Sequence, residues 1–363
     1  MAAQLPDDFK CPISLEVMSD PVILSSGHSF DRSSIQRWLD TGHRTCPITK
    51  LPLPEPPFLI PNHALRSLIS NYSRLSQPAA AAAESQALVS SLTSPASSLS
   101  TKIESLCQLN KLMRGNSGLR RRLTESGVVS AVLGCVDSEH HPSLQLKALS
   151  FLLSLSLDDD SKVGLVAEGA IGPIIAALVG GSPDCRAVAA TLLTSLAVVE
   201  VNKATIGSYP GAIRALVFLL RDGKGRERKE AATALWAMCS FPDNRRRAVD
   251  SGAVPIVIRI ADMGLERAVG LLGLLAKCRE GRQEMVKCDG VVEILVAILK
   301  KGSSRSVQYA LSTLNSLWSC SDRLCSEATI QEVLEICKGL LEDDNEKIRR
   351  SASALIQALK REQ

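Results

Sequence analysis

The stretch "CPISLEVMSDPVILSSGHSFDRSSIQRWLDTGHRTCPIT", residues 11–49, starts and ends with a motif that looks like half of a zinc-ligand pair. A cross-braced zinc module needs two complete sets of four Cys or His ligands, because structural Zn²⁺ is tetrahedral. At the spacing of such modules, only Cys11, His28 and Cys46 are side chains that bind zinc. Three ligands divided over two sites complete neither tetrahedron. We therefore predict no metal here and interpret Cys11 and Cys46 as small buried hydrophobic residues.

Local sequence signals predict a small mixed structure around this stretch. "PVILSSGHSF" has two short runs around Gly27, which can adopt the positive φ of a tight turn. "DRSSIQRWLDTG" has an apolar stripe at helical spacing between N-cap candidates and a glycine. The expected elements are strands at 22–24 and 29–30, a helix that starts after Asp31 or Ser33 and ends at Gly42, and a second helix after Asn62.

Hydrogen bonds must hold the two loops if zinc does not. Structural zinc stabilises small modules by roughly 10–16 kcal/mol, whereas one charge-assisted hydrogen bond contributes about 1.5–3 kcal/mol. A network of several bonds is therefore required. Short polar side chains stand where the ligands would be, and charged residues lie beside them. We predict a structural network of Ser14, Glu16, His28, Asp31, Arg32 and Thr49, with Ser26 and Ser34 at further former ligand positions.

Residues 6–72 closely resemble the U-box, the zinc-free relative of the RING finger. The motifs "CPIS", "DPVIL", "GHSFDR", "IQRWL", "CPIT" and "LIPNHALR" occur in this order. The resemblance implies a small α+β fold. It also implies an activity: the module recruits a ubiquitin-conjugating enzyme (E2) that carries ubiquitin as a thioester, and promotes ubiquitin transfer to a lysine of a bound protein.

The resemblance assigns roles to particular residues. In U-box and RING modules the E2 docks in a shallow groove between the two loops and the central helix, which here places Ile13, Leu15, Trp38 and Pro47 at the contact. Exposed apolar patches commonly mark interaction sites. Active members often carry an arginine after the second loop that positions the E2 and ubiquitin. The matching residue here is Lys50, which keeps the charge but lacks the planar fork of donors.

The resemblance implies no catalytic nucleophile and no cofactor on this chain. The rate gain would come from holding the thioester and ubiquitin in a reactive arrangement, which is a proximity effect. A covalent ligase would instead accept ubiquitin on its own cysteine, and this needs an exposed thiol with a lowered pKa. Cys320 and Cys325 are the candidates for that alternative. We interpret both as packing residues of buried helices.

One phrase recurs along the rest of the chain: "ESGVVSAVLGCV", "EGAIGPIIAALV", "PGAIRALVFLLR", "SGAVPIVIRIAD" and "DGVVEILVAILK". A second apolar stripe at helical spacing follows each of the middle copies. The glycine can end a short lead-in helix by adopting the αL conformation. A repeat of this length predicts a solenoid. The glycines are Gly127, Gly169, Gly211, Gly252 and Gly290, spaced 42, 42, 41 and 38 residues apart.

This pattern of short, middle and long helices resembles the armadillo repeat. Helical repeats of the HEAT type are the nearest alternative, but they lack the recurrent Gly-Ala-Ile phrase. We predict a U-box over residues 5–76 and an all-α, right-handed armadillo solenoid over 101–363, with about five full units and partial end units. The Ala/Ser/Pro-rich residues 77–100 between them are interpreted as a linker or a ragged cap.

An armadillo solenoid presents one long helix per repeat on a concave face, which forms a groove for an extended peptide. We therefore expect the repeats to bind a protein substrate. Nuclear-import adaptors of this fold hold basic peptides with a Trp followed by an Asn one turn later. Trp236 lacks that Asn, and Asn315 precedes Trp318, so the import function is poorly supported. Basic runs at 221–230 and 245–247 are interpreted as solvated helix ends, with an acidic peptide partner as the alternative.

Composition limits the remaining possibilities. The chain has 363 residues, 45% of them hydrophobic but only 3% aromatic, which is typical of packed helices. A net charge of +4 over this length argues against nucleic acid as the main partner. Eleven scattered cysteines favour a reducing compartment, so we expect a cytoplasmic protein, with the nucleus as a second location. No run of apolar residues is long enough to predict a membrane span or a signal peptide.

Together, the two parts resemble the plant U-box ligases with C-terminal armadillo repeats. The resemblance predicts an E3 ubiquitin ligase of the RING type, whose partners are an E2, ubiquitin and an unidentified protein substrate. The alternative function is a non-catalytic armadillo scaffold with a degenerate U-box, and Lys50 is the residue that favours it. A zinc-binding RING protein is contradicted by the ligand count.

Overall fold

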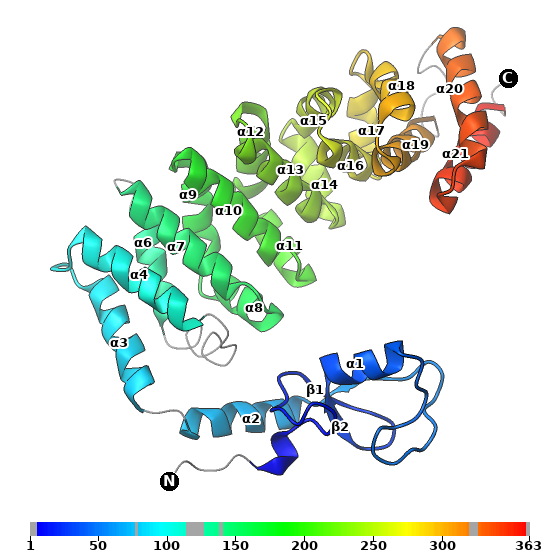
Figure 1. Cartoon of the computed structure of the whole chain (residues 1–363). Coiled ribbons are helices and arrows are strands. Elements are labelled where there is room, and N and C mark those ends of the chain that lie inside the picture. Colours follow the sequence, from blue (N-terminus) through cyan, green and yellow to red (C-terminus); the bar gives the residue numbers. More distant parts are fainter. Residues whose placement is uncertain (1–5, 77–78, 114–126, 138–140, 319–325, 361–363) are drawn as a thin grey trace. The chain divides into compact units, whose positions relative to one another are not determined.

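The computed structural model describes residues 6–76, 79–113, 127–137, 141–318 and 326–360, with the side chains of 70–84 left out. The chain divides into two compact units, residues 1–87 and 88–363 (Figure 1). No single helix in the described ranges is long and apolar enough to cross a membrane. Helices α8 (Asp159–Ala167) and α9 (Ile171–Gly180) meet the length and composition test only as a pair, and they are bent by 83° at the break.

The first unit is built on a three-stranded antiparallel sheet in the order β2-β1-β3. The predicted hairpin is present, with Val22 opposite Phe30. The third strand was not predicted, because its two residues are a proline-containing pair with no strand pattern of their own; Pro61 lies opposite Val22. The elements are η1 (Asp7–Phe9), β1 (Pro21–Ile23), β2 (Ser29–Asp31), α1 (Arg32–Asp40), β3 (Ile60–Pro61) and α2 (His63–Ser76).

Both helix starts of this unit follow from their capping residues. Asp31 is the N-cap of α1, and its side chain accepts a hydrogen bond from the Ser33 backbone N–H. Asn62 accepts a hydrogen bond from the backbone N–H of Leu65. Each satisfies an N–H that has no partner inside the helix. The small core beneath them consists of Cys11, Met18, Val22, Leu24, Phe30, Ile35, Leu39, Cys46, Leu53 and Ile69.

The second unit consists of stacked repeats, and the recurrent glycines mark their first turns. All five have the positive φ that the sequence predicts, between 75° and 83°. The helices are α3 (Ala79–Thr93), α4 (Leu99–Met113), α6 (Val128–Val136), α7 (Pro142–Leu155), α8 (Asp159–Ala167), α9 (Ile171–Gly180), α10 (Pro183–Leu196), α11 (Glu200–Ser208), α12 (Ala212–Asp222), α13 (Arg226–Cys239), α14 (Pro242–Asp250), α15 (Ala253–Asp262), α16 (Glu266–Leu275), α17 (Arg279–Val286), α18 (Val291–Lys301), α19 (Ser304–Trp318), α20 (Glu327–Gly339) and α21 (Glu346–Lys360), with the short η2 (Leu340–Glu342).

Equivalent helices of successive repeats pack side by side, so the solenoid has three rows. The first-helix row contains α8, α11, α14 and α17, and the second-helix row contains α6, α9, α12, α15, α18 and α20. The third-helix row contains α7, α10, α13, α16, α19 and α21. One continuous apolar core runs between the rows. The third-helix row is the surface that the sequence predicts as a peptide groove.

The segment predicted as a linker or a ragged cap is largely helical. Helix α3 covers Ala79–Thr93, and its residues Val89 and Leu92 are buried in the core of the repeats. Alanine-rich sequences form helices without a marked amphipathic period, because alanine has the highest helix propensity. The end of this segment therefore packs as part of the solenoid.

Candidate functional site

The first loop of the N-terminal unit is closed by its own backbone. The Cys11 N–H donates to the carbonyl of Glu16 at 2.7 Å, and the Leu15 N–H donates to the carbonyl of Cys11 at 2.8 Å. Leu15 adopts a positive φ of 60°, which is uncommon for a residue with a branched side chain. The Ser14 hydroxyl lies 3.4 Å from the Glu16 N–H. Glu16 thus takes part through its backbone, and its carboxylate is exposed.

The second loop repeats this geometry. The Cys46 N–H donates to the carbonyl of Leu51, and the Lys50 N–H donates to the carbonyl of Cys46, both at 2.9 Å. Lys50 has a φ of 61°, and the Thr49 hydroxyl lies 3.4 Å from the Leu51 N–H. The two "CPI" motifs therefore fold into equivalent turns. Each turn aims its cysteine inward and the residues after it outward.

Both thiols are fully buried, as the sequence predicts, but they also accept hydrogen bonds. The Cys11 Sγ accepts from the Asp31 N–H at 3.3 Å, and the Cys46 Sγ accepts from the Ser26 hydroxyl at 3.1 Å. Burial raises the pKa of Cys46, but hydrogen bonds from Ser26 and Thr49 outweigh it and lower the pKa to about 7. The cysteines are therefore polar anchors of the loops as well as core residues.

Asp31 is the hub that connects the first loop region to the central helix. One carboxylate oxygen accepts from the Ser33 N–H and hydroxyl, at 3.2 and 2.8 Å. The other accepts from the N–H groups of Ser19 and Asp20, at 2.6 and 3.1 Å, and from the Ser19 hydroxyl. Burial raises the pKa of Asp31, but these hydrogen bonds outweigh it, so the net shift is downward. A charged acceptor suits this position because donors surround it.

The other predicted network residues make fewer contacts. Arg32 donates from Nε to the Asp20 carboxylate at 2.6 Å, and Arg66 lies 3.9 Å from the same carboxylate. The His28 Nδ1 lies 3.0 Å from the Ser26 carbonyl. Asp20 was not predicted, although its place directly before Pro21 keeps it out of a helix and in an extended segment. In the described residues, no group of three or more His, Cys, Asp or Glu side chains could hold a metal ion.

Apolar side chains predicted to contact the E2 lie at the surface of the two loops. Leu15 is 74% exposed and Ile13 is 36% exposed, and Pro47 is half-buried on the second loop. Ile48, which the sequence interpretation omitted, is 44% exposed beside Pro47. The positive φ of Leu15 turns its side chain away from the core. A signal for Ile48 was present, since it occupies the same place in "CPIT" as Ile13 does in "CPIS".

Trp38 lies in the same unit, half-buried against the core. Its indole Nε1 donates to the Thr45 carbonyl at 2.9 Å, and its ring stacks on His43 with the ring centroids 3.8 Å apart. The Lys50 ammonium lies 5.7 Å from the Trp38 ring and donates to the Pro47 carbonyl at 2.9 Å. The indole therefore ties the central helix to the second loop, and Lys50 is folded back over it.

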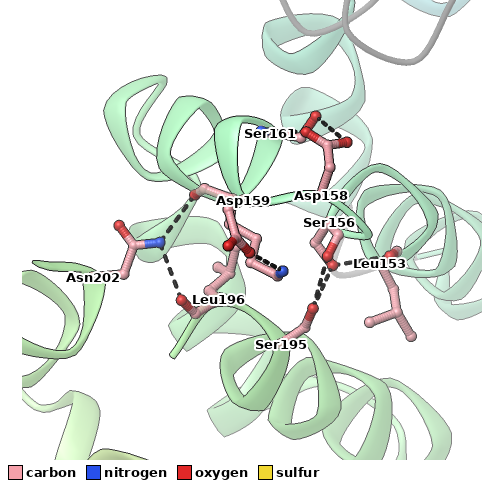
Figure 2. A network of polar contacts seen from close by, with 9 residues as sticks. Leu153, Ser156, Asp158, Asp159, Ser161, Ser195, Leu196 and Asn202 are labelled. Carbon is pink, nitrogen blue, oxygen red and sulfur yellow. Dashed lines mark hydrogen bonds and ion pairs between the residues drawn. The ribbon is translucent and has the colours of Figure 1, made fainter. Parts of the chain in front are cut away.

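Buried amides link neighbouring repeats of the second unit, and Figure 2 shows one of them, Asn202. The Asn202 Nδ2 donates to the carbonyls of Lys162, in the preceding repeat, and Leu196, both at 3.1 Å. Asn244 repeats this arrangement one repeat later, and its Nδ2 donates to the carbonyls of Lys203 and Met238 at 2.9 and 3.0 Å. Each amide thus links the carbonyl of the first helix of the preceding repeat to the carbonyl at the end of the third helix before it.

The aromatic residues considered for peptide binding have different environments. Trp318 is 3% exposed and belongs to the core. Asn315 donates to the carbonyls of Leu311 and Ser351, both at 3.0 Å, which is a structural contact between α19 and α21. Trp236 is half-buried on the third-helix row. The tandem Trp and Asn pattern of the import adaptors is absent from these positions.

Comparison with known proteins accounts for nearly the whole chain. The family model of the U-box domain matches residues 5–77, and that of the plant U-box protein ARM repeat region matches residues 84–363. U-box domain-containing protein 8 of Arabidopsis thaliana is 59% identical over 99% of this chain and 98% of that protein. E3 ubiquitin-protein ligase PUB23 of Arabidopsis thaliana is 27% identical over 92% of this chain and 86% of that protein.

The structure comparison supports the fold alone. A crystal structure of an engineered protein covers 76% of this chain and 68% of its own length, with a TM-score of 0.64 and 22% identity. The U-box and armadillo resemblances are therefore confirmed, and the HEAT alternative is not supported. The chain belongs to the family of plant U-box proteins that carry an armadillo (ARM) repeat region.

Proposed function

We propose that this chain is an E3 ubiquitin ligase whose U-box binds a ubiquitin-charged E2 and whose ARM repeats bind the protein substrate. The family supports this activity, and one relative is named as an E3 ubiquitin-protein ligase. The observation that carries the proposal is the apolar surface of the two loops. Ile13, Leu15 and Ile48 are exposed there on turns that the buried network fixes.

A fixed groove favours E2 binding because little conformational freedom is lost on association. The Cys11 and Cys46 turns and the Asp31 hub supply this rigidity. Trp38 forms the side of the groove on the central helix, and its bond to Thr45 keeps the ring oriented. The proposed contacts are Ile13, Leu15, Trp38 and Pro47, as the sequence predicts, together with Ile48.

The proposed reaction is transfer of ubiquitin directly from the E2. The substrate lysine nitrogen attacks the thioester carbonyl carbon, the new C–N bond forms, and the C–S bond breaks. The E2 cysteine leaves as the thiolate and takes the proton that the amine loses. This chain forms no bond to ubiquitin and contributes by proximity and orientation.

Three buried cysteines, Cys46, Cys239 and Cys337, are unsuited to carrying a covalent intermediate. Burial raises the pKa of Cys239 to about 12 and that of Cys337 to about 11, so neither thiol is a nucleophile at neutral pH. Cys46 has a lowered pKa, but it is fully buried and cannot reach an E2 thioester. Cys320 and Cys325, the candidates for the covalent alternative, lie outside the described residues.

Lys50 is proposed to contact the E2 and ubiquitin together. Its ammonium donates to the Pro47 carbonyl, so one of its three N–H donors is already used and two are available to a partner. An arginine would have more donors and could keep the Pro47 contact while it reaches the partner. We therefore expect Lys50→Arg to raise the rate of transfer.

Discharge of a charged E2 onto free lysine tests the proposal directly. With purified activating enzyme, E2 and the full chain, Ile13→Ala and Pro47→Ala should slow discharge by about tenfold or more, the size of a lost interface anchor. Leu68→Ala is the matched control, since Leu68 is an exposed leucine of the same unit outside the groove. Trp38→Ala also removes the Thr45 contact, so its melting temperature must be measured beside its activity.

The scaffold function remains the alternative, and the same assay separates it. Its motivation is Lys50 at the position where active members often carry an arginine. A wild-type chain that is folded and yet inactive with a panel of E2 enzymes would favour the scaffold. Recovery of activity in Lys50→Arg would then assign the defect to this residue.

A further inference from the structure

Helix α16 differs from its neighbours on the third-helix row in length and in side-chain size. It has 10 residues, whereas α13 has 14 and α19 has 15. At Gly270 a Cβ atom would lie 2.9 Å from Tyr309 Cε2 and 3.2 Å from Trp236 Nε1. Two aromatic rings from the helices on either side therefore meet over a residue that has no side chain. We call Trp236, Gly270 and Tyr309 the aromatic shelf.

Arg267 adds a charge to this shelf. Its guanidinium carbon lies 4.5 Å from the centre of the Trp236 ring. A guanidinium stacked on a ring keeps its N–H donors at its edge, where they can bind a planar carboxylate. Among the described residues, Arg267 has no carboxylate partner within ion-pair distance. Arg267 thus lies over the ring and is available for an acidic group.

The helices that carry the shelf have more basic than acidic residues. Lys229 on α13 and Lys277 after α16 are exposed and have no ion pair within the described part of the chain. The acids of this stretch are mostly neutralised: Glu227 pairs with Arg186, and Glu266 with Arg305. Glu230 is the remaining acid without a salt bridge in these helices. A basic ligand would meet net repulsion here, and an acidic ligand net attraction.

A second pairing of arginine with an aromatic residue differs from the shelf in its row and in the neutralisation of its charge. On α12, in the second-helix row, Arg214 and Arg221 lie 5.8 and 4.7 Å from the Phe218 ring. Arg221 makes two hydrogen bonds of 2.8 Å to Asp222, so its charge is already neutralised. The α12 pairing lies on a different row and offers a matched control.

We propose that the aromatic shelf and Arg267 form the binding site for an acidic, extended segment of the substrate, with an apolar side chain on the rings and a carboxylate on Arg267. This inference rests on the proposed substrate-binding function of the ARM repeats and names its chemistry. Trp236 and Tyr309 supply a rigid apolar surface, and residues of this type dominate binding energy in interfaces. Arg267 supplies the preference for a carboxylate over an amide of the same shape.

A display library of short random peptides selected on the immobilised full chain tests the chemistry without a known substrate. We expect enrichment of Asp or Glu next to an apolar residue. The enrichment should disappear in Arg267→Glu and persist in the matched control Arg214→Glu. Enrichment of Lys or Arg, no charge preference, no enriched peptide, or an identical preference in Arg267→Glu would each overturn the proposal.

The best enriched peptide then measures the contribution of each residue by fluorescence anisotropy. Trp236→Ala and Arg267→Glu should weaken binding about tenfold or more, and Phe218→Ala should not. Replacing the peptide's Glu by Gln should weaken binding to wild type and change little in Arg267→Gln. Equal losses for Phe218→Ala, or no loss for Trp236→Ala in a chain with native circular dichroism, would place the site elsewhere.

The E2 discharge assay keeps this inference separate from the proposed ligase function. Trp236→Ala should discharge ubiquitin onto free lysine at the wild-type rate, because the E2 contacts the U-box. If the chain binds the acidic peptide but discharges no E2, the proposed ligase function is contradicted and the proposed peptide site is kept. If the chain discharges the E2 but shows no preference for acidic peptides, the peptide site is contradicted and the ligase function is kept.

Discussion

Buried polar side chains stabilise both units, but their hydrogen-bonding roles are opposite. In the U-box, the Asp31 carboxylate accepts from loop N–H groups, and the thiols of Cys11 and Cys46 accept from the Asp31 N–H and the Ser26 hydroxyl. In the repeats, the amides of Asn202 and Asn244 each donate to carbonyl groups of two helices. The U-box network is therefore built on side-chain acceptors, and the repeat contacts are built on side-chain donors.

The asparagine side chain suits its place between repeats, because its amide has two N–H donors and can bridge carbonyls of adjacent repeats.

The largest expected effect comes from replacing the Asp31 carboxylate, which only accepts hydrogen bonds, by an amide that also donates them. Asp31→Asn places an amide N–H₂ among the N–H donors of Ser19 and Asp20, or removes the charge that attracts them. We expect a loss of about 3–5 kcal/mol, because several charge-assisted bonds and an N-cap are weakened together. Urea unfolding followed by hydrogen exchange of residues 6–76 in the full chain measures it. A loss below about 1 kcal/mol would mean that the hub is not the main support of the loops.

Replacement of the buried amide of Asn244 is expected to destabilise the repeats nearly as much as Asp31→Asn destabilises the U-box. Asn244→Asp puts a carboxylate against the carbonyls of Lys203 and Met238, and Asn244→Ala leaves both without this donor. We expect about 2–3 kcal/mol for the alanine variant and more for the aspartate. Hydrogen exchange of α11 to α14 reports the local loss. The control is Gln331→Ala, an exposed amide on α20. Equal losses in Gln331→Ala and Asn244→Ala would contradict the comparison.

A smaller, pH-dependent effect is expected for the thiol of Cys46. Its folded pKa of about 7 lies below the ordinary value of 9.0, so the folded state favours the thiolate. The resulting stability is fully present above about pH 9 and is lost as the pH falls through 7. Ser26→Ala removes one donor to this thiolate. The variant should lose about 1 kcal/mol more at pH 9 than at pH 6. Melting curves at the two pH values measure it, and an equal loss at both would assign Cys46 to the thiol form.

The smallest expected effect is that of a chelator. Because hydrogen bonds hold the loops, EDTA should leave the melting temperature of the U-box unchanged, and elemental analysis should find far less than two zinc ions per chain. Asp31→Asn in the same experiment is the positive control for loss of the network. Unfolding of the wild type by the chelator would show that a metal supports the loops after all.

Much of the fold could be predicted from local residues. Asp31 and Asn62 cap helices as expected, and the recurrent glycines adopt the αL conformation that their position demanded. Local rules work there because a cap or a glycine turn is stabilised by contacts within a few residues. The strand β3 was missed because two residues with a proline are stabilised only by pairing with β1, which lies about 40 residues away in the chain.

The candidate sites also combine features that local sequence determines with features that only packing determines. The sequence alone determined the family pattern, the capping residues, the repeat period and the absence of a complete zinc-ligand set, since each depends on residue type and spacing. Only the tertiary structure decided that Ser19 and Asp20 complete the network, and that Trp236, Arg267, Gly270 and Tyr309 form one surface. Those contacts join different loops or different repeats, and the free energy that selects them arises only when distant segments pack together.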